Sequence, residues 1–143
     1  MFNEEVRSIM TLDPVVVSPK QTIAEVSKMM TDKRLQQVPV VDNGQLLGLL
    51  TSYDLWKKAA TTNDQTLVEN VMNINVLKIT PIDKVGTAAE LFMDKRFKTI
   101  PVVNLRNELK GVVTAFDLIK HMFGTEYEPR QTIYPEAIAD VKS

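Results

Sequence analysis

The apolar and polar positions of this chain form a regular succession of short elements. From Thr22 to Lys33, apolar side chains recur at helical spacing, and Thr22 stands where a helix N-cap is expected. Residues 38–41 and 46–50 are two apolar runs separated by Asn43-Gly44, a dipeptide typical of a tight β-hairpin. A second helix is expected to begin near Thr51.

The same pattern returns in the second half of the chain. Pro39-Val40-Val41 recurs as Pro101-Val102-Val103, and Asp32-Lys33-Arg34 recurs as Asp94-Lys95-Arg96, at one constant spacing. A single extra residue then falls in the turn of the second hairpin. This regularity indicates a duplication, so we expect two copies of one structural unit.

A short β-branched run opens each copy. Residues 15–17 and 76–79 are expected to be brief strands, ended by Pro19 and Pro81. Each copy then has the order βαββα, which predicts a mixed α/β fold of the α+β class with two units in one module. We place the first unit at 6–62, the linker at 63–67, the second unit at 68–123 and a C-terminal tail at 124–143.

Composition restricts the function. The 143 residues carry a formal net charge of −1, so a nucleic-acid binder with a basic face is not expected. Cysteine is absent and His121 is the single histidine, which removes thiolate nucleophiles and histidine-based catalytic or metal sites. No signal peptide or membrane span is recognisable, and the cytoplasm is the expected compartment. We therefore expect no enzyme, no catalytic cofactor and no metal site.

Two segments carry the same distinctive motif. Gly48–Asp54 and Gly111–Asp117 both read G-h-h-T-x-x-D, where h is apolar, and each follows a Pro-Val-Val strand. This order of elements, found twice over roughly residues 6–122, resembles the CBS domain, named for cystathionine β-synthase. The resemblance implies a stand-alone CBS pair, or Bateman module, whose units pack through their sheets about a pseudo-twofold axis. It further implies a regulatory ligand among AMP, ADP, ATP and S-adenosylmethionine, bound in clefts between the units.

The repeated Thr-x-x-Asp pairs permit two interpretations. Thr51 with Asp54, and Thr114 with Asp117, can form capping boxes in which Thr caps the helix and Asp reaches back. A carboxylate can also accept hydrogen bonds from both hydroxyls of a ribose diol, with a neighbouring hydroxyl adding a contact. The resemblance favours the ligand, and one carboxylate can serve both purposes.

The resemblance also assigns residues to two clefts. The Asp that ends the motif of one copy would lie beside a base that is held by the opening β-branched segment of the other copy. One cleft would then combine Asp117 and Thr114 with Val15, Val16 and Val17, and the other would combine Asp54 and Thr51 with Val76, Leu77 and Ile79.

Further residues are assigned on the same ground. Leu35 and Phe97 would lie against the base, where ordinary packing is the alternative. Arg34 and Arg96 would lie near the phosphates, where a solvated helix end is the alternative. Lys20 would add a charge to the Asp117 cleft alone, because its counterpart in the second copy is apolar.

The leading hypothesis is a module that senses an adenine nucleotide and signals to an unidentified effector protein. A dimerisation or interaction scaffold without ligand is the alternative. The resemblance also implies a homodimer, and the candidate contacts are the apolar side chains of the last helix in each copy, namely Tyr53, Trp56, Phe116 and Ile119.

Overall fold

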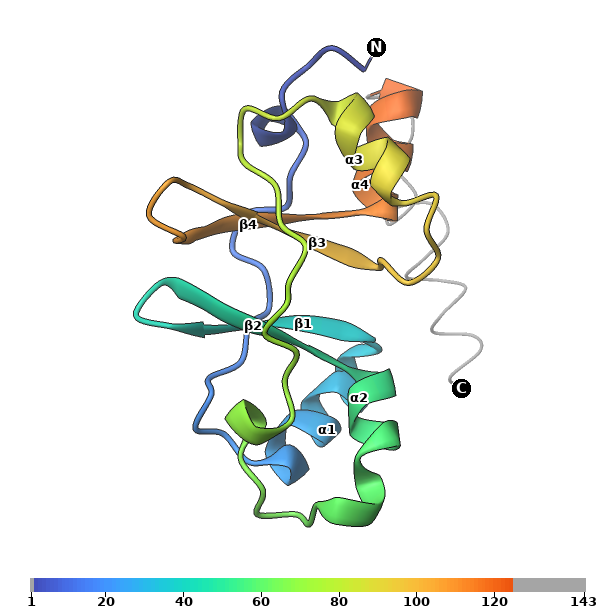
Figure 1. Cartoon of the computed structure of the whole chain (residues 1–143). Coiled ribbons are helices and arrows are strands. Elements are labelled where there is room, and N and C mark those ends of the chain that lie inside the picture. The colour runs from blue at the N-terminus through green and yellow to red at the C-terminus, as the bar shows by residue number, and fades with distance from the viewer. Residues whose placement is uncertain (1, 125–143) are drawn as a thin grey trace.

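The computed structural model describes residues 2–124 and consists of two similar halves (Figure 1). The first half contains α1 (Ile23–Lys33), β1 (Gln37–Asp42), β2 (Gln45–Thr51) and α2 (Ser52–Lys57), and the second contains α3 (Val85–Leu91), β3 (Thr99–Val103), β4 (Leu109–Thr114) and α4 (Ala115–Phe123). Short 3-10 turns are η1 (Val6–Ser8), η2 (Ala59–Thr61) and η3 (Val68–Asn70). The two hairpins face each other in the middle, and the helices lie on their outer sides. The α+β fold of two units is confirmed. The tail expected at 124–143 lies outside the described residues except for Gly124.

Both predicted hairpins form, each as a two-stranded antiparallel sheet. The first turn has positive φ at Asn43 (51°) and Gly44 (81°), as a two-residue hairpin of type I′ requires. In each hairpin the register shifts by one residue after the Pro-Val pair, between Val40 and Val41 and at the matching place in the second unit. The hairpins also join at their turns, because Leu46 N donates to Asn107 O over 3.0 Å.

The prediction of brief strands at 15–17 and 76–79 is wrong. Each reduces to one parallel bridge, Val17 with Val40 and Ile79 with Val102. Prolines on both sides explain this, since a longer ladder would need N–H groups that proline lacks. In the first unit those prolines are Pro39, before the bridge on β1, and Pro19, after the bridge on the other segment.

The first helix of each unit differs between the copies. α1 begins with a capping box between Thr22 and Glu25, as the N-cap prediction requires. In α3 the N-cap is Lys84, which provides no side-chain cap, and Gly86 lowers the helix propensity of the first turn. α3 ends at Leu91, four residues before the position that corresponds to the end of α1, and Met93, beyond that end, is 82% exposed. No helix within residues 2–124 is long and apolar enough to cross a membrane.

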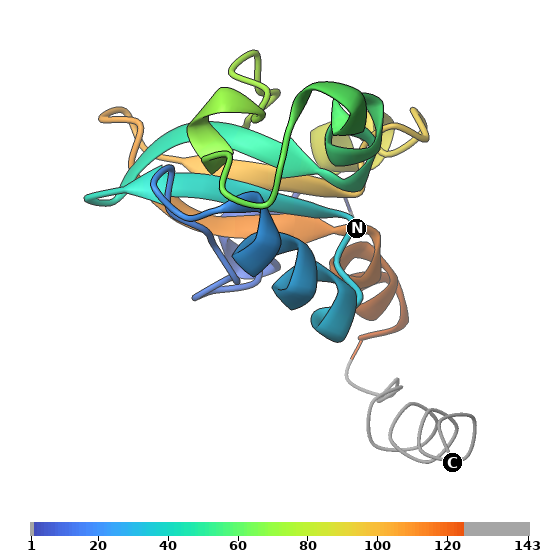
Figure 2. The same ribbon diagram turned by 90° about the horizontal axis from the view of Figure 1, so that it is seen from below.

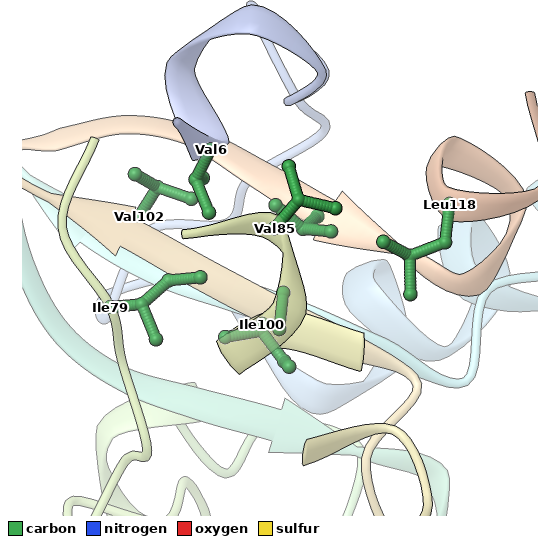
Figure 3. Packing of buried hydrophobic residues seen from close by; sticks show 8 residues of the cluster. Val6, Ile79, Val85, Ile100, Val102 and Leu118 are labelled. Atoms are coloured by element: carbon green, nitrogen blue, oxygen red, sulfur yellow. The ribbon is translucent and has the colours of Figure 1, made fainter. Parts of the chain in front are cut away.

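The first residues of each repeat pack in the other unit. Val6 of η1 is fully buried in the core of the second unit, among Ile79, Ile100 and Leu118 (Figure 3). Val68, at the corresponding place of the second repeat, is buried in the core of the first unit. The spatial units therefore exchange a segment, which the order of the sequence does not reveal. Figure 1 shows η1 beside the second unit and η3 beside the first.

The exchanged segments explain the glycine of the repeated motif. Thr11 pairs with Val112 of β4 through hydrogen bonds of 2.8 and 3.0 Å. A Cβ on Gly111 would lie 2.7 Å from the backbone oxygen of Thr11, and one on Gly48 would lie 2.9 Å from that of Asn73. Glycine at these two positions lets the crossing segment approach the strand closely.

Candidate functional site

A cavity of about 730 Å³ opens between the two units, within the size range of small-molecule sites. The first unit contributes the junction of β2 and α2, and the second contributes the segments 73–77 and 95–99. The cavity brings together Thr51, Asp54, Val76 and Leu77, which were assigned to one cleft. It adds Phe97, expected against the base, and Arg96, expected near the phosphates. Ile79, assigned to the same cleft, is buried in the core of the second unit instead.

Asp54 keeps a carboxylate oxygen available to the cavity. Thr51 caps α2, because its hydroxyl accepts a hydrogen bond of 2.9 Å from Asp54 N. The same hydroxyl donates to Asp54 Oδ2 over 2.8 Å. No donor between residues 2 and 124 reaches Oδ1, so the capping box is only half formed. A half-buried carboxylate with an open oxygen can accept hydroxyl donors from a ligand.

Arg96 and Phe97 lie together on the wall from the second unit. The Arg96 guanidinium pairs with Asp94 over 2.7 Å, and its hydrogen bonds lower the pKa of Asp94 to about 2. The guanidinium carbon lies 5.8 Å from the centre of the Phe97 ring. Phe97 is half-buried and also packs on the core of the second unit, so it offers the cavity a ring of restricted mobility.

Gln37 fixes this wall against the first unit. Its Nε2 donates to the backbone oxygen of Arg96 over 2.7 Å, and its Oε1 accepts from Lys98 N and Thr99 N over 2.9 and 3.0 Å. The side chain therefore holds three backbone groups of the second unit from β1. Sequence reasoning missed this position, although a polar residue at the start of an apolar strand is a signal that could have indicated it.

Other lining residues were also missed. Lys57, Lys95 and Lys98 border the cavity, as do Asn73 and Asn75. The two asparagines form a turn in which Asn75 N donates to Asn73 Oδ1 over 2.9 Å. Only the fold places these residues beside Asp54, since nothing in their local sequence marks them as part of a cleft.

The second motif has a different environment. Asp117 is 8% exposed, and its two carboxylate oxygens accept three hydrogen bonds. Thr11, on the exchanged segment, donates to Oδ1 over 2.8 Å; Thr114 donates to Oδ2 through its backbone N (2.8 Å) and its hydroxyl (3.1 Å). The capping box is complete here, and the space beside Asp117 measures about 290 Å³.

The remaining predicted residues do not line that space. Val17 is buried in the core of the first unit, and Leu35 packs against the same core. Arg34 is the C-cap of α1, with φ of 58°, and Lys20 pairs with Glu69 over 2.8 Å. Val15 and Val16 are exposed. The structure thus brings most of the group assigned to Asp54 to one cavity, whereas the space beside Asp117 is lined by Ile9, Met10, Thr11, Phe116 and Lys120.

Comparison with known proteins gives a consistent result. The family model described as the CBS domain matches residues 6–55 and 68–124. The CBS domain-containing protein YhcV of Bacillus subtilis is 31% identical over 123 residues, which cover 85% of this chain and 87% of that protein. The match to a homoserine O-acetyltransferase of Methanohalobium evestigatum, 30% identical, covers 79% of this chain and 23% of that enzyme.

Solved structures agree in fold. CBSX2 of Arabidopsis thaliana, described as a CBS-pair protein, superposes with a TM-score of 0.76 at 22% identity, over 85% of this chain and 95% of that one. The CBS domain pair of protein MJ0100, solved in complex with 5′-methylthioadenosine and S-adenosyl-L-methionine, superposes with a TM-score of 0.68 at 27% identity, over 86% and 98%. Two matched segments, two similar units and their shared motifs agree, and the chain belongs to the CBS domain family.

Proposed function

We propose that this chain is a regulatory module that binds an adenine nucleotide in the cavity at Asp54. The observation that carries the proposal is the cavity itself, which combines an open carboxylate oxygen from one unit with an aromatic ring and a guanidinium from the other. A carboxylate, an aromatic face and a cation are the groups that suit a ribose diol, a purine and a phosphate.

Six of the lining residues have a role in this proposal. Asp54 accepts hydrogen bonds from the ribose hydroxyls through Oδ1, and Thr51 adds a hydroxyl contact. Phe97 stacks on the base, while Val76 and Leu77 provide apolar contacts and backbone groups at its edge. Arg96 contacts phosphate with the donors that Asp94 leaves free.

The relatives support an adenine-containing ligand. The CBS pair of MJ0100 was solved with two such compounds, and a structure of CBSX2 was solved in complex with AMP. The proposal for this chain is sensing without a reaction: ligand binding biases the arrangement of the two units, and an effector protein reads the change. A ligand can shift such an equilibrium only by its different affinities for the two states.

We place one ligand in each chain. At the second motif, Thr11 and Thr114 already donate to both oxygens of Asp117, so the carboxylate is not open to a diol. The adjacent space of about 290 Å³ is less than half that of the cavity at Asp54. A nucleotide at Asp117 would have to displace the exchanged segment.

Titration calorimetry and thermal shift with AMP, ADP, ATP and S-adenosylmethionine test the proposal. We expect saturable binding of adenine nucleotides at micromolar to millimolar strength, one ligand per chain, and no product. A ligand that binds only the folded state stabilises it and so raises the melting temperature. At a ligand concentration one hundred times Kd, the free energy of unfolding rises by about 2.7 kcal/mol. If no member of the panel released heat or shifted the midpoint, the nucleotide proposal would be rejected in favour of the scaffold alternative.

We also propose a homodimer that forms through the helix face carrying Trp56. Trp56 is 75% exposed and Tyr53 is 60% exposed, and their ring centres lie 6.1 Å apart. Ile119 of α4 is exposed as well, and Phe116 is half-buried. Exposed aromatic pairs are enriched at interfaces between copies.

Light scattering tests the dimer. We expect twice the chain mass at micromolar concentration, and a monomer after Trp56→Glu, because burying a carboxylate in an apolar interface opposes association. Lys110→Glu, at an exposed position of β4 away from these helices, is the control and should remain dimeric. A wild-type monomer at these concentrations would exclude the dimer.

A further inference from the structure

Cationic side chains surround the cavity at Asp54. Lys57 of α2 borders it from the first unit, and Lys95, Arg96 and Lys98 border it from the second. Among the described residues that line the cavity, Asp54 is the single carboxylate. The wall therefore carries an excess of positive charge, although the whole chain has a formal net charge of −1.

The lysines at the cavity have no local counter-charge. Within residues 2–124, no carboxylate lies within ion-pair distance of Lys57, Lys95 or Lys98. Of the other lysines in this range, Lys20 pairs with Glu69 and Lys28 pairs with Asp32, so the feature particular to the cavity is that three unpaired lysines border one site. The Arg96 charge is partly balanced by Asp94, so the lysines provide most of the uncompensated charge.

The duplication gives an internal comparison. Lys98 corresponds to Gln36 of the first copy, and Asn75, on the same wall, corresponds to Asp13. Both differences make the Asp54 cavity more positive than the equivalent place in the other half. The other three cations of the wall recur as Lys33, Arg34 and Lys120, so the difference between the two sides comes from these two positions.

We propose that this cavity selects its ligand by phosphate charge, so that affinity rises from adenosine through AMP to ADP and ATP. The inference rests on the adenine-nucleotide site proposed above. Lysine ammonium groups are compact point charges that suit phosphate oxygens, and each added phosphate can meet another of the lysines. S-adenosylmethionine carries a sulfonium and a net positive charge, and it is repelled by the same groups.

Calorimetry with adenosine, AMP, ATP, S-adenosylmethionine and inorganic tripolyphosphate tests the selection. We expect ATP to bind about tenfold or more tightly than adenosine, since exposed charge pairs contribute up to about fivefold each. S-adenosylmethionine is expected to bind more weakly than adenosine. Added salt should weaken the binding of ATP more than that of AMP and leave the binding of adenosine nearly unchanged, because salt screens exposed charges.

Charge-matched variants locate the effect. The double variant Lys95→Gln with Lys98→Gln should lose about tenfold in ATP affinity while adenosine affinity stays within about twofold. The control is Lys33→Gln with Lys110→Gln, which removes the same net charge from exposed positions that do not line the cavity. The control should bind ATP as the wild type does.

The outcomes separate this inference from the proposed function. Equal affinities for adenosine and ATP, or equal losses in the two double variants, would overturn the phosphate selection and leave the adenine site standing. Binding of tripolyphosphate as tightly as ATP, without adenosine binding, would support the anion-selective cavity and overturn the adenine proposal. Tight binding of S-adenosylmethionine would overturn the selection directly.

Discussion

Replacing Asp117 with alanine is expected to lower the free energy of unfolding by about 2–4 kcal/mol. The substitution removes the acceptor of three hydrogen bonds, of which two come from Thr114 and one from Thr11. It leaves the N-terminal backbone of α4 without its reciprocal cap, and it removes one of the contacts that hold the exchanged segment on the second unit. Urea unfolding followed by circular dichroism measures the loss.

Asp54→Ala is the matched control, since it removes the same group from the equivalent position of the other repeat. Asp54 accepts one hydrogen bond, from a hydroxyl that can turn to other partners, so a loss of about 1 kcal/mol or less is expected. Equal losses in the two variants would show that the contact between Asp117 and Thr11 contributes little, and the structural role assigned to Asp117 would be abandoned.

Asp54→Asn is expected to reduce nucleotide affinity by about one to two orders of magnitude, which corresponds to about 1.5–3 kcal/mol. The amide replaces a charged acceptor by a weaker one and adds a donor that faces the ribose hydroxyls. Thr51 still accepts from the backbone N of residue 54, so the cap of α2 and the melting temperature should be nearly unchanged. Calorimetry with the tightest-binding nucleotide measures the affinity.

Phosphate selectivity provides a check on this variant. Because the diol is common to all the nucleotides and to adenosine, Asp54→Asn should weaken each of them by a similar factor. Unchanged binding in the variant would show that Asp54 does not contact the ligand, and the site would then have to be moved away from the β2–α2 junction.

Much of the fold could be predicted from the sequence because its signals are local. The Asn43-Gly44 turn needs positive φ at both residues, and Thr22 with Glu25 has the chemistry of a capping box. The strands expected at the start of each copy could not be predicted correctly. The length of their pairing with the hairpin depends on where prolines lie in both paired segments. Pro39 and Pro19 end that pairing from opposite sides.

The candidate site, like the fold, could be predicted only in part. Thr51 and Asp54 are adjacent within a motif, and a resemblance to known proteins paired them with Val76 and Phe97, which line the same cavity. The difference between Asp54 and Asp117 was not foreseeable, because it depends on Thr11, which is distant in sequence from both. Two identical motifs therefore acquire different surroundings through a contact that only the tertiary structure creates.

The exchange of segments also determines when each half can form during synthesis. The core of the first unit uses residues between Val17 and Met72, so all of it is available once that stretch has left the ribosome. The core of the second unit joins Val6 to Leu118, which closes a loop spanning most of the chain. The N-terminal segment is therefore translated first and docks last, and the sequence separation of its contacts makes the second half the slower one to assemble.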